Sequence, residues 1–186
     1  MVMRARRLQL KLYAEPETLG DPERVVPVFH DWIRERRLDE TLVDVARYGH
    51  VHEGPAVLLV GHSTDYAIDL GEGRAGLVTT RKAGAASDAE RIPDVFRRAL
   101  HAAVLLEREV KGLVFSSHEL LLVAPDRLNL PNLPETFAAH RAEIADCVGK
   151  LLGEVELAHE GGPDERFSVR ILRGKHEPVS VVLARV

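Results

Sequence analysis

Nine histidines in 186 residues raise the question of a metal site or a general base. The densest group is His50, His52 and His62, with Glu53 directly after the second of them. Alternate residues of a β-strand project from the same face, so His50 and His52 could both bind one metal ion. A zinc ion held there would lower the pKa of a bound water molecule, with Glu53 as a base or a further ligand. The candidate metal site is therefore His50, His52 and Glu53.

Strand geometry argues against a compact centre made of three histidines. A short hairpin loop after His52 would pair His52 with Val57. It would also pair His50 with Leu59, which leaves His62 on the other face of the sheet. A shift of one residue restores the face but leaves His62 about four strand residues, or ~13 Å, from His50. Zinc–imidazole bonds are ~2.1 Å long, so the favoured interpretation is hydrogen bonding at a strand end and no cofactor.

A second group of polar residues, at positions 62–66, lies where a buried apolar run ends. A third group, Arg81 and Lys82, follows the next predicted strand. Strand ends commonly carry functional side chains. The candidate ligand-binding residues are His62, Ser63, Asp65, Tyr66, Arg81 and Lys82. Arg81 and Lys82 lead, through Gly84 and Ser87, to a predicted helix N-terminus, where backbone amides could bind an anion.

The same residues have a plainer explanation. Neighbours along a strand point in opposite directions, so His62 and Ser63 do not form a catalytic pair. The chain also lacks the Gly-x-Ser-x-Gly motif of a nucleophile elbow. A turn with local hydrogen bonds, followed by a solvated loop, is the favoured interpretation.

Composition and charge indicate an ordinary globular protein. The chain is 45% hydrophobic and 29% charged, with a net charge of -4, which argues against a general nucleic-acid binder. The basic residues near the N-terminus fit the polar face of a strand. No apolar run reaches the ~20 residues of a membrane-spanning helix, and the N-terminus lacks the apolar stretch of a signal peptide. The single cysteine, Cys147, suits a reducing compartment, so a cytoplasmic location is expected.

Hydrophobic periodicity predicts an α+β fold with a largely antiparallel sheet and about three packed helices. Apolar residues at helical spacing predict helices after Pro27, near Ile92 and at Pro134. Alternating segments lie between them, and the Gly71–Gly73 reversal predicts a hairpin. One globular domain over residues 1–186 is expected, with two halves that could meet near residue 111.

The C-terminal run Val179–Val186 is apolar and contains a single charge, Arg185. As a strand at a sheet edge, it could pair with a second copy of the chain or with a protein partner. As a central strand, it would instead be covered on both faces. Sequence alone leaves both possibilities open.

The functional prediction depends on which motifs are missing. The chain has no nucleophile elbow, phosphate-binding loop, paired-carboxylate motif or closed metal signature. We therefore expect a cytoplasmic, non-catalytic protein that binds a protein partner or a small ligand. The alternative is a metal-dependent enzyme that uses zinc or a similar ion at His50, His52 and Glu53.

Overall fold

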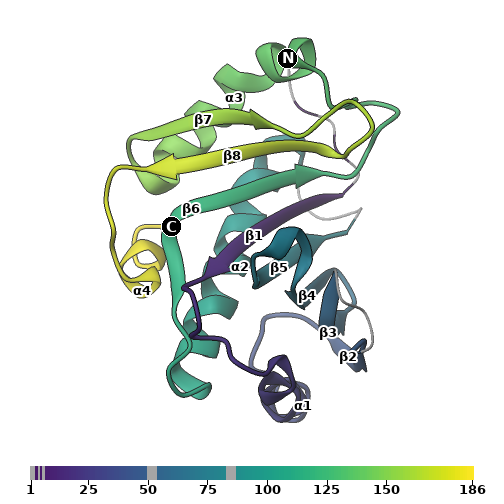
Figure 1. Ribbon diagram of the computed structural model, residues 1–186, viewed down its shortest axis with the longest axis vertical. Helices are drawn as coiled ribbons and strands as arrows, with labels where there is room; N and C mark the ends of the chain where they lie inside the picture. The colour runs from purple at the N-terminus through teal and green to yellow at the C-terminus, as the bar shows by residue number, and fades with distance from the viewer. Residues whose placement is uncertain (1–2, 4, 6, 50–53, 83–86) are drawn as a thin grey trace.

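The computed structural model describes all residues except 1–2, 4, 6, 50–53 and 83–86. In the described residues, one antiparallel sheet contains eight strands in the order β2-β3-β4-β5-β1-β6-β8-β7 (Figure 1). The strands are β1 (Leu8–Ala14), β2 (Leu42–Arg47), β3 (Pro55–Gly61), β4 (Thr64–Asp69), β5 (Gly76–Arg81), β6 (Phe115–Ala124), β7 (Val155–Glu160) and β8 (Phe167–Arg173). Because β1 pairs with both β5 and β6, the two β-rich portions of the chain share one sheet.

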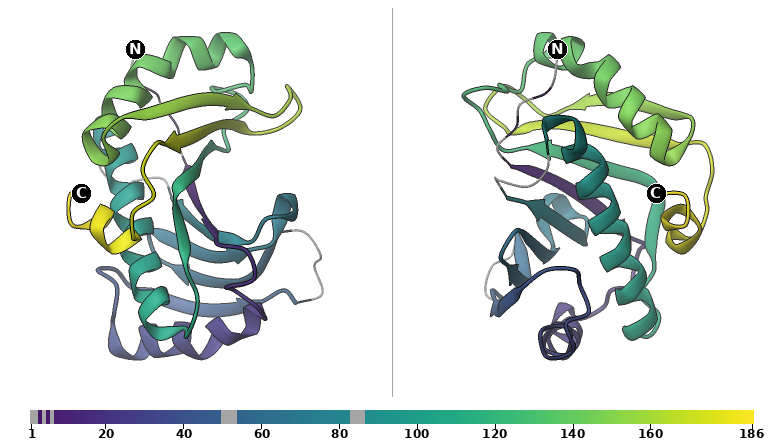
Figure 2. Two further views of the ribbon diagram at one scale, coloured as in Figure 1. Left: turned by 60° about the vertical axis from the view of Figure 1, so that its left-hand side comes forward. Right: turned by 180° about the vertical axis from the view of Figure 1, so that it is seen from behind.

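Four α-helices pack on one face of this sheet and confirm the predicted α+β class (Figure 2). They are α1 (Val26–Glu35), α2 (Arg91–Glu109), α3 (Pro134–Leu152) and the short α4 (Val179–Leu183). Helix α2 crosses β1 and β5, α3 lies on β7, and α4 contacts α2 and β6. We call the opposite side of the sheet, where no described α-helix packs, the open face.

Side-chain alternation sorts the residues of β1 between the two faces. Leu8, Leu10 and Leu12 are buried against the helices, where they join Phe29, Trp32 and the apolar face of α2 in one core. Gln9, Lys11 and Tyr13 project from the open face, as a period of two requires. Strand β1 therefore presents the polar half of its alternating pattern to the open face.

Local signals in the sequence set several element boundaries as expected. Ser87 and Glu90 form a capping box before α2, and Pro134 occupies the first position of α3. The hairpin between β4 and β5 is confirmed, with Asp69 opposite Gly76. Glu72 and Gly73 adopt positive φ values of 64° and 65° in the short helix η2 (Gly71–Gly73), which makes the reversal.

The predicted C-terminal strand is wrong, because residues 179–183 form helix α4. Val179 and Val182 are buried against the core, whereas Val181 is 40% exposed. A three-residue step between buried positions is helical, since a strand would bury residues 179 and 181 together. The strands at the two edges of the sheet are β2 and β7, so partner binding through a C-terminal strand has no structural basis.

The two longest helices, α2 and α3, contain 19 residues each. Both carry charged side chains along one face, as helices packed on one side of a sheet do. Within the described part of the chain, no helix is both long and apolar enough to cross a membrane.

Candidate functional site

Three of the predicted ligand-binding residues meet on the helix side of the sheet, around the buried carboxylate of Glu40. Ser63 donates from its amide and its hydroxyl to Glu40 Oε2, at 3.0 and 2.9 Å. The Tyr66 hydroxyl donates to Oε1 at 3.1 Å, and the side chain of Glu40 is only 4% exposed. Arg81 donates to the carbonyl oxygen of Ser63 at 2.9 Å. Ser63, Tyr66 and Arg81 therefore lie in one hydrogen-bonded group with Glu40.

On α2, Asp94 and Arg98 extend this cluster with charges of alternating sign. Arg81 Nε lies 2.5 Å from one oxygen of Asp94, and Arg98 Nε lies 3.1 Å from the other. Arg98 also reaches Glu40 Oε1 at 3.3 Å. We call Glu40, Ser63, Tyr66, Arg81, Asp94 and Arg98 the polar cluster. Each carboxylate in it accepts from at least one cation, so their charges are balanced internally.

The chemistry available to the polar cluster is limited by these contacts. Burial, followed by the nearby Glu40 carboxylate, raises the pKa of Tyr66, so the phenol stays protonated. A hollow of about 320 Å³ lies beside Tyr66 and Arg98 and is also lined by His101. Burial and the neighbouring Arg108 and Arg37 lower the pKa of His101. The arrangement is that of a structural tie between the loop before β2, strand β4 and helix α2.

The other three predicted residues lie elsewhere. Asp65 and Lys82 project from the open face and pair with each other at 2.7 Å, and Lys82 also donates to the Gly61 carbonyl oxygen. His62 is exposed, and its backbone amide donates to Thr41. The six candidates therefore do not form one site, because adjacent strand positions point to opposite faces.

The candidate metal ligands His50, His52 and Glu53 lie outside the described residues. The expected pairing of the two histidines with Val57 and Leu59 is wrong, because Val57 pairs with Arg47 and Leu59 with Val45. Among the residues that the structure describes, no three His, Cys, Asp or Glu side chains gather closely enough to hold a metal ion. The metal site stays a prediction, which elemental analysis of protein purified without a histidine tag would test.

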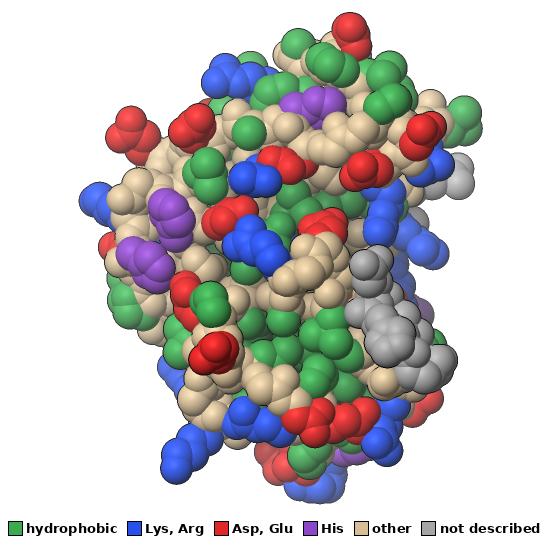
Figure 3. Space-filling model, in the orientation of Figure 1, with side chains coloured by type: hydrophobic (Ala, Val, Ile, Leu, Met, Phe, Trp, Pro, Cys, Tyr) green, Lys and Arg blue, Asp and Glu red, His purple; other side chains and the backbone are tan. Residues whose placement is uncertain are grey.

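A larger hollow, of about 600 Å³, lies on the open face over β3, β4, β5, β1 and β6. We call it the groove. One row of its floor consists of side chains directly opposite one another on neighbouring strands: Leu58, Ala67, Val78, Lys11 and Leu121. The next row consists of Asp65, Thr80, Gln9, Val123 and Ser168. The first row is therefore apolar apart from Lys11 and the second is polar apart from Val123, and hydrophobic atoms gather low in the centre of this face in Figure 3.

Lys11 is the one cation in the middle of this floor. Its side chain is 5% exposed, and its ammonium group lies 2.8 Å from an oxygen of Asp69. It also donates to the carbonyl oxygen of Gly71, at 2.9 Å, where η2 folds over the open face. Burial of a lysine requires such pairing, so Lys11 is neutralised within the protein itself.

Beside the groove, charged side chains of the open face pair with one another. Arg74 forms two hydrogen bonds with Glu119, at 2.7 and 3.1 Å, and its guanidinium lies 3.7 Å from the Tyr13 ring centroid. The hydrogen bonds from Arg74 lower the pKa of Glu119. Burial, and then the charge of Glu72, raises the pKa of Tyr13 to about 12. The charges in this part of the face therefore interact with one another.

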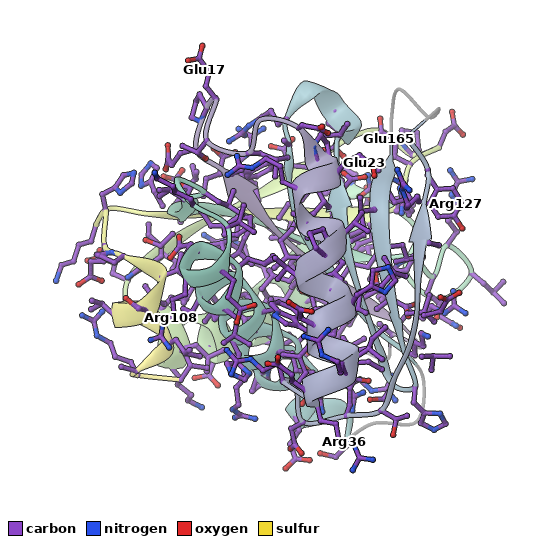
Figure 4. All side chains as sticks on the ribbon, turned by 90° about the horizontal axis from the view of Figure 1, so that it is seen from below. Glu17, Glu23, Arg36, Arg108, Arg127 and Glu165 are labelled. Atoms are coloured by element: carbon purple, nitrogen blue, oxygen red, sulfur yellow. The ribbon has the colours of Figure 1, made fainter. Side chains whose placement is uncertain are left out.

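One end of the groove differs, because three exposed arginines gather there. Arg7 and Arg127 make no hydrogen bond or ion pair with any described residue, and Arg166 reaches only the Gln9 side chain, at 3.3 Å. Lys and Arg side chains group on the right of this face in Figure 3. Figure 4 shows Arg127 on the same side of the molecule as Glu165, with Arg108 on the opposite side. These arginines are available to a partner.

Sequence reasoning did not find the groove, although one signal for it exists. Leu120–Val123 is apolar at four successive positions, which indicates a strand with apolar side chains on both faces. The cross-strand rows, however, depend on a strand order that places β1 between β5 and β6. A single sequence does not reveal that order.

Comparison with known proteins adds no further constraint on function. No model of a protein family matches the chain, and no curated protein matches it.

Proposed function

We propose that the protein is a non-catalytic binding protein that holds a polypeptide partner in the groove. The observation that carries this proposal is the pairing of an apolar floor with uncompensated charges at its edge. Val78 and Val123 are only half-buried, because no helix covers them on the open face. Apolar surface beside free charges is typical of sites that bind another molecule.

The properties of the groove fit a polypeptide better than a compact small molecule. Its edges carry exposed charges of both signs, including Arg127, Glu72 and Asp164. Leu128, which is 91% exposed, directly follows Arg127 in the chain. A polypeptide can supply apolar and charged side chains together, whereas small-molecule pockets are usually more enclosed.

The state of the polar cluster supports binding over catalysis. Glu40 and Asp94 are the acids of the cluster, and both already accept hydrogen bonds from arginine. A general base must be free to take a proton from its substrate, whereas the oxygens of both carboxylates are already occupied by hydrogen bonds within the protein. The polar cluster therefore supplies rigidity to the sheet that forms the groove.

The proposed location is the cytoplasm. Cys147 is partly buried on α3, and burial, followed by the charges of Glu143 and Asp146, raises the pKa of its thiol. A thiol of this kind is unreactive, which suits a protein in a reducing compartment without disulfides.

Selection from a displayed library of random dodecapeptides tests the proposal. We expect enriched peptides to bind the purified protein with micromolar affinity and to lose at least ten-fold in affinity on Val78→Asp, which places a charge in the floor. Val181→Asp makes the same change at an exposed position on α4, far from the groove, and should leave binding unchanged. Equal losses in both variants, or no enrichment over an unrelated protein, would contradict the proposal. Circular dichroism would confirm that both variants are folded.

A further inference from the structure

We infer that the groove selects a partner segment with an acidic side chain at one end of a short apolar stretch. The acidic side chain would lie among Arg7, Arg127 and Arg166. This inference rests on the proposed function, because it specifies which polypeptide the groove binds.

The register of the sheet places the three arginines at the same end of the groove. Gln9 lies opposite Val123, which in turn lies opposite Ser168. Arg7 precedes Gln9 by two residues, Arg127 follows Val123 by four, and Arg166 precedes Ser168 by two. Since β1 and β8 each run antiparallel to β6, all three steps lead off the same end of the strands.

The charges at this end sum to a positive value. Two carboxylates in the β7–β8 turn, Asp164 and Glu165, also line the groove beside the three arginines. The Glu165 carboxylate lies against the backbone of Gly161, within the turn itself. Three guanidinium groups and two carboxylates leave one net positive charge, with the guanidinium groups suited to paired hydrogen bonds with an incoming carboxylate.

Among the described lining residues, the opposite end of the groove carries no comparable cluster of arginines. Lys11 and Asp69 neutralise each other, and the exposed Glu72 interacts electrostatically with Arg74 and Tyr13. Lys11 lies four residues along β1 from Arg7, a separation of ~13 Å at the rise of a strand. About four extended residues of a partner can therefore span the distance from the arginines to the middle of the floor.

The floor between the two ends defines the middle of the partner segment. Val78, Leu121 and Val123 lie between the arginines and Glu72, with Leu58 and Ala67 beside them. An extended peptide points alternate side chains to one side, so two apolar side chains two residues apart would reach this floor. The expected sequence is an Asp or Glu followed or preceded within about four residues by such an apolar pair.

The test is the dodecapeptide selection repeated on an Arg127→Glu, Arg166→Glu double variant. Peptides selected on the unaltered protein should be enriched in Asp or Glu beside an apolar pair, and the double variant should lose this enrichment. The best synthetic peptide should bind the double variant at least ten-fold more weakly and should bind the unaltered protein more weakly as salt increases. Arg108→Glu reverses an exposed charge on the opposite side of the molecule. This control variant should bind the synthetic peptide as tightly as the unaltered protein does.

The outcomes separate this inference from the proposed function. Peptides that depend on Val78 but show no acidic preference would overturn the inference and leave the proposed function standing. Peptides that bind the double variant and the unaltered protein equally would overturn it in the same way. Failure to select any peptide, or equal binding to the Val78→Asp variant, would overturn both.

Discussion

The two faces of the sheet treat charged side chains in opposite ways. On the helix side, Glu40, Asp94 and their arginines form a closed cluster, and Glu40 is 4% exposed. At one end of the open face, Arg7 and Arg127 project into solvent without a partner among the described residues. A buried charge must be paired because its desolvation is costly, whereas a solvated charge carries no such penalty. The same side-chain types therefore hold the fold together on one face and remain available for binding on the other.

The largest effect is expected from Glu40→Ala, which opens the polar cluster. The substitution leaves Ser63, Thr64, Tyr66 and Arg98 without the carboxylate that accepts their hydrogen bonds. Removing one partner of a buried ion pair costs about 3–5 kcal/mol, so the free energy of unfolding should fall by that amount. Urea denaturation followed by circular dichroism measures it.

Glu35→Ala is the matched control, because Glu35 pairs with Arg34 and Arg37 at the surface and its side chain is 51% exposed. An exposed pair contributes about 0–1 kcal/mol, so this variant should unfold close to the unaltered protein. Similar losses in the two variants would mean that the polar cluster is not the structural tie described above.

A smaller effect is expected where helix α4 replaces the predicted strand. Val182 is 1% exposed against the core and Val181 is 40% exposed. Val182→Ala should therefore lower the free energy of unfolding by about 2 kcal/mol, through lost burial and a small cavity. Val181→Ala should change it by less than about 0.5 kcal/mol. A larger loss for Val181→Ala than for Val182→Ala in a denaturant titration would favour the predicted strand and contradict the helical packing of the C-terminus.

The fold class and the hairpin at Gly71–Gly73 were predictable, because period-two alternation and positive-φ turns are local signals. Ser63, Tyr66 and Arg81 were predictable as polar residues near strand ends, but their shared contacts were not. Its organiser, Glu40, lies 23 residues before Ser63 and belongs to no motif. The C-terminal strand failed because valines favour strands locally, whereas packing against α2 decides the outcome. The groove could not be predicted without the strand order, which depends on contacts between residues far apart in sequence.

Acid should weaken the contact that fastens the segment before α4 to β8. Glu177 accepts hydrogen bonds from Arg173 at 2.8 Å and from Arg185 at 2.8 and 2.7 Å. These bonds, with that of Arg185 the larger, lower the pKa of Glu177 from 4.5 to about 2. A carboxylate with a lowered pKa in the folded state stabilises the protein fully above about pH 4.5, and this stabilisation is lost as the pH falls toward 2.

Glu177→Gln removes the titrating group, so its stability should depend less steeply on pH between about 4.5 and 2 than that of the unaltered protein. Arg185→Gln should flatten the same interval in part, because one of the two arginines remains. Urea midpoints measured across the interval provide the comparison. Identical slopes for all three proteins would show that the contact adds nothing to stability in solution.

The smallest effect on stability is expected at the arginine end of the groove. Arg7→Ala, Arg127→Ala and Arg166→Ala remove exposed side chains that bond weakly or not at all with the described residues, so each should change the free energy of unfolding by less than about 0.5 kcal/mol. Peptide binding should nevertheless weaken in all three. A stability loss above about 1 kcal/mol in any of them would mean that this arginine is held by the protein's own chain. The contrast between a closed face and an available one would then fail, because both faces would use their arginines for folding.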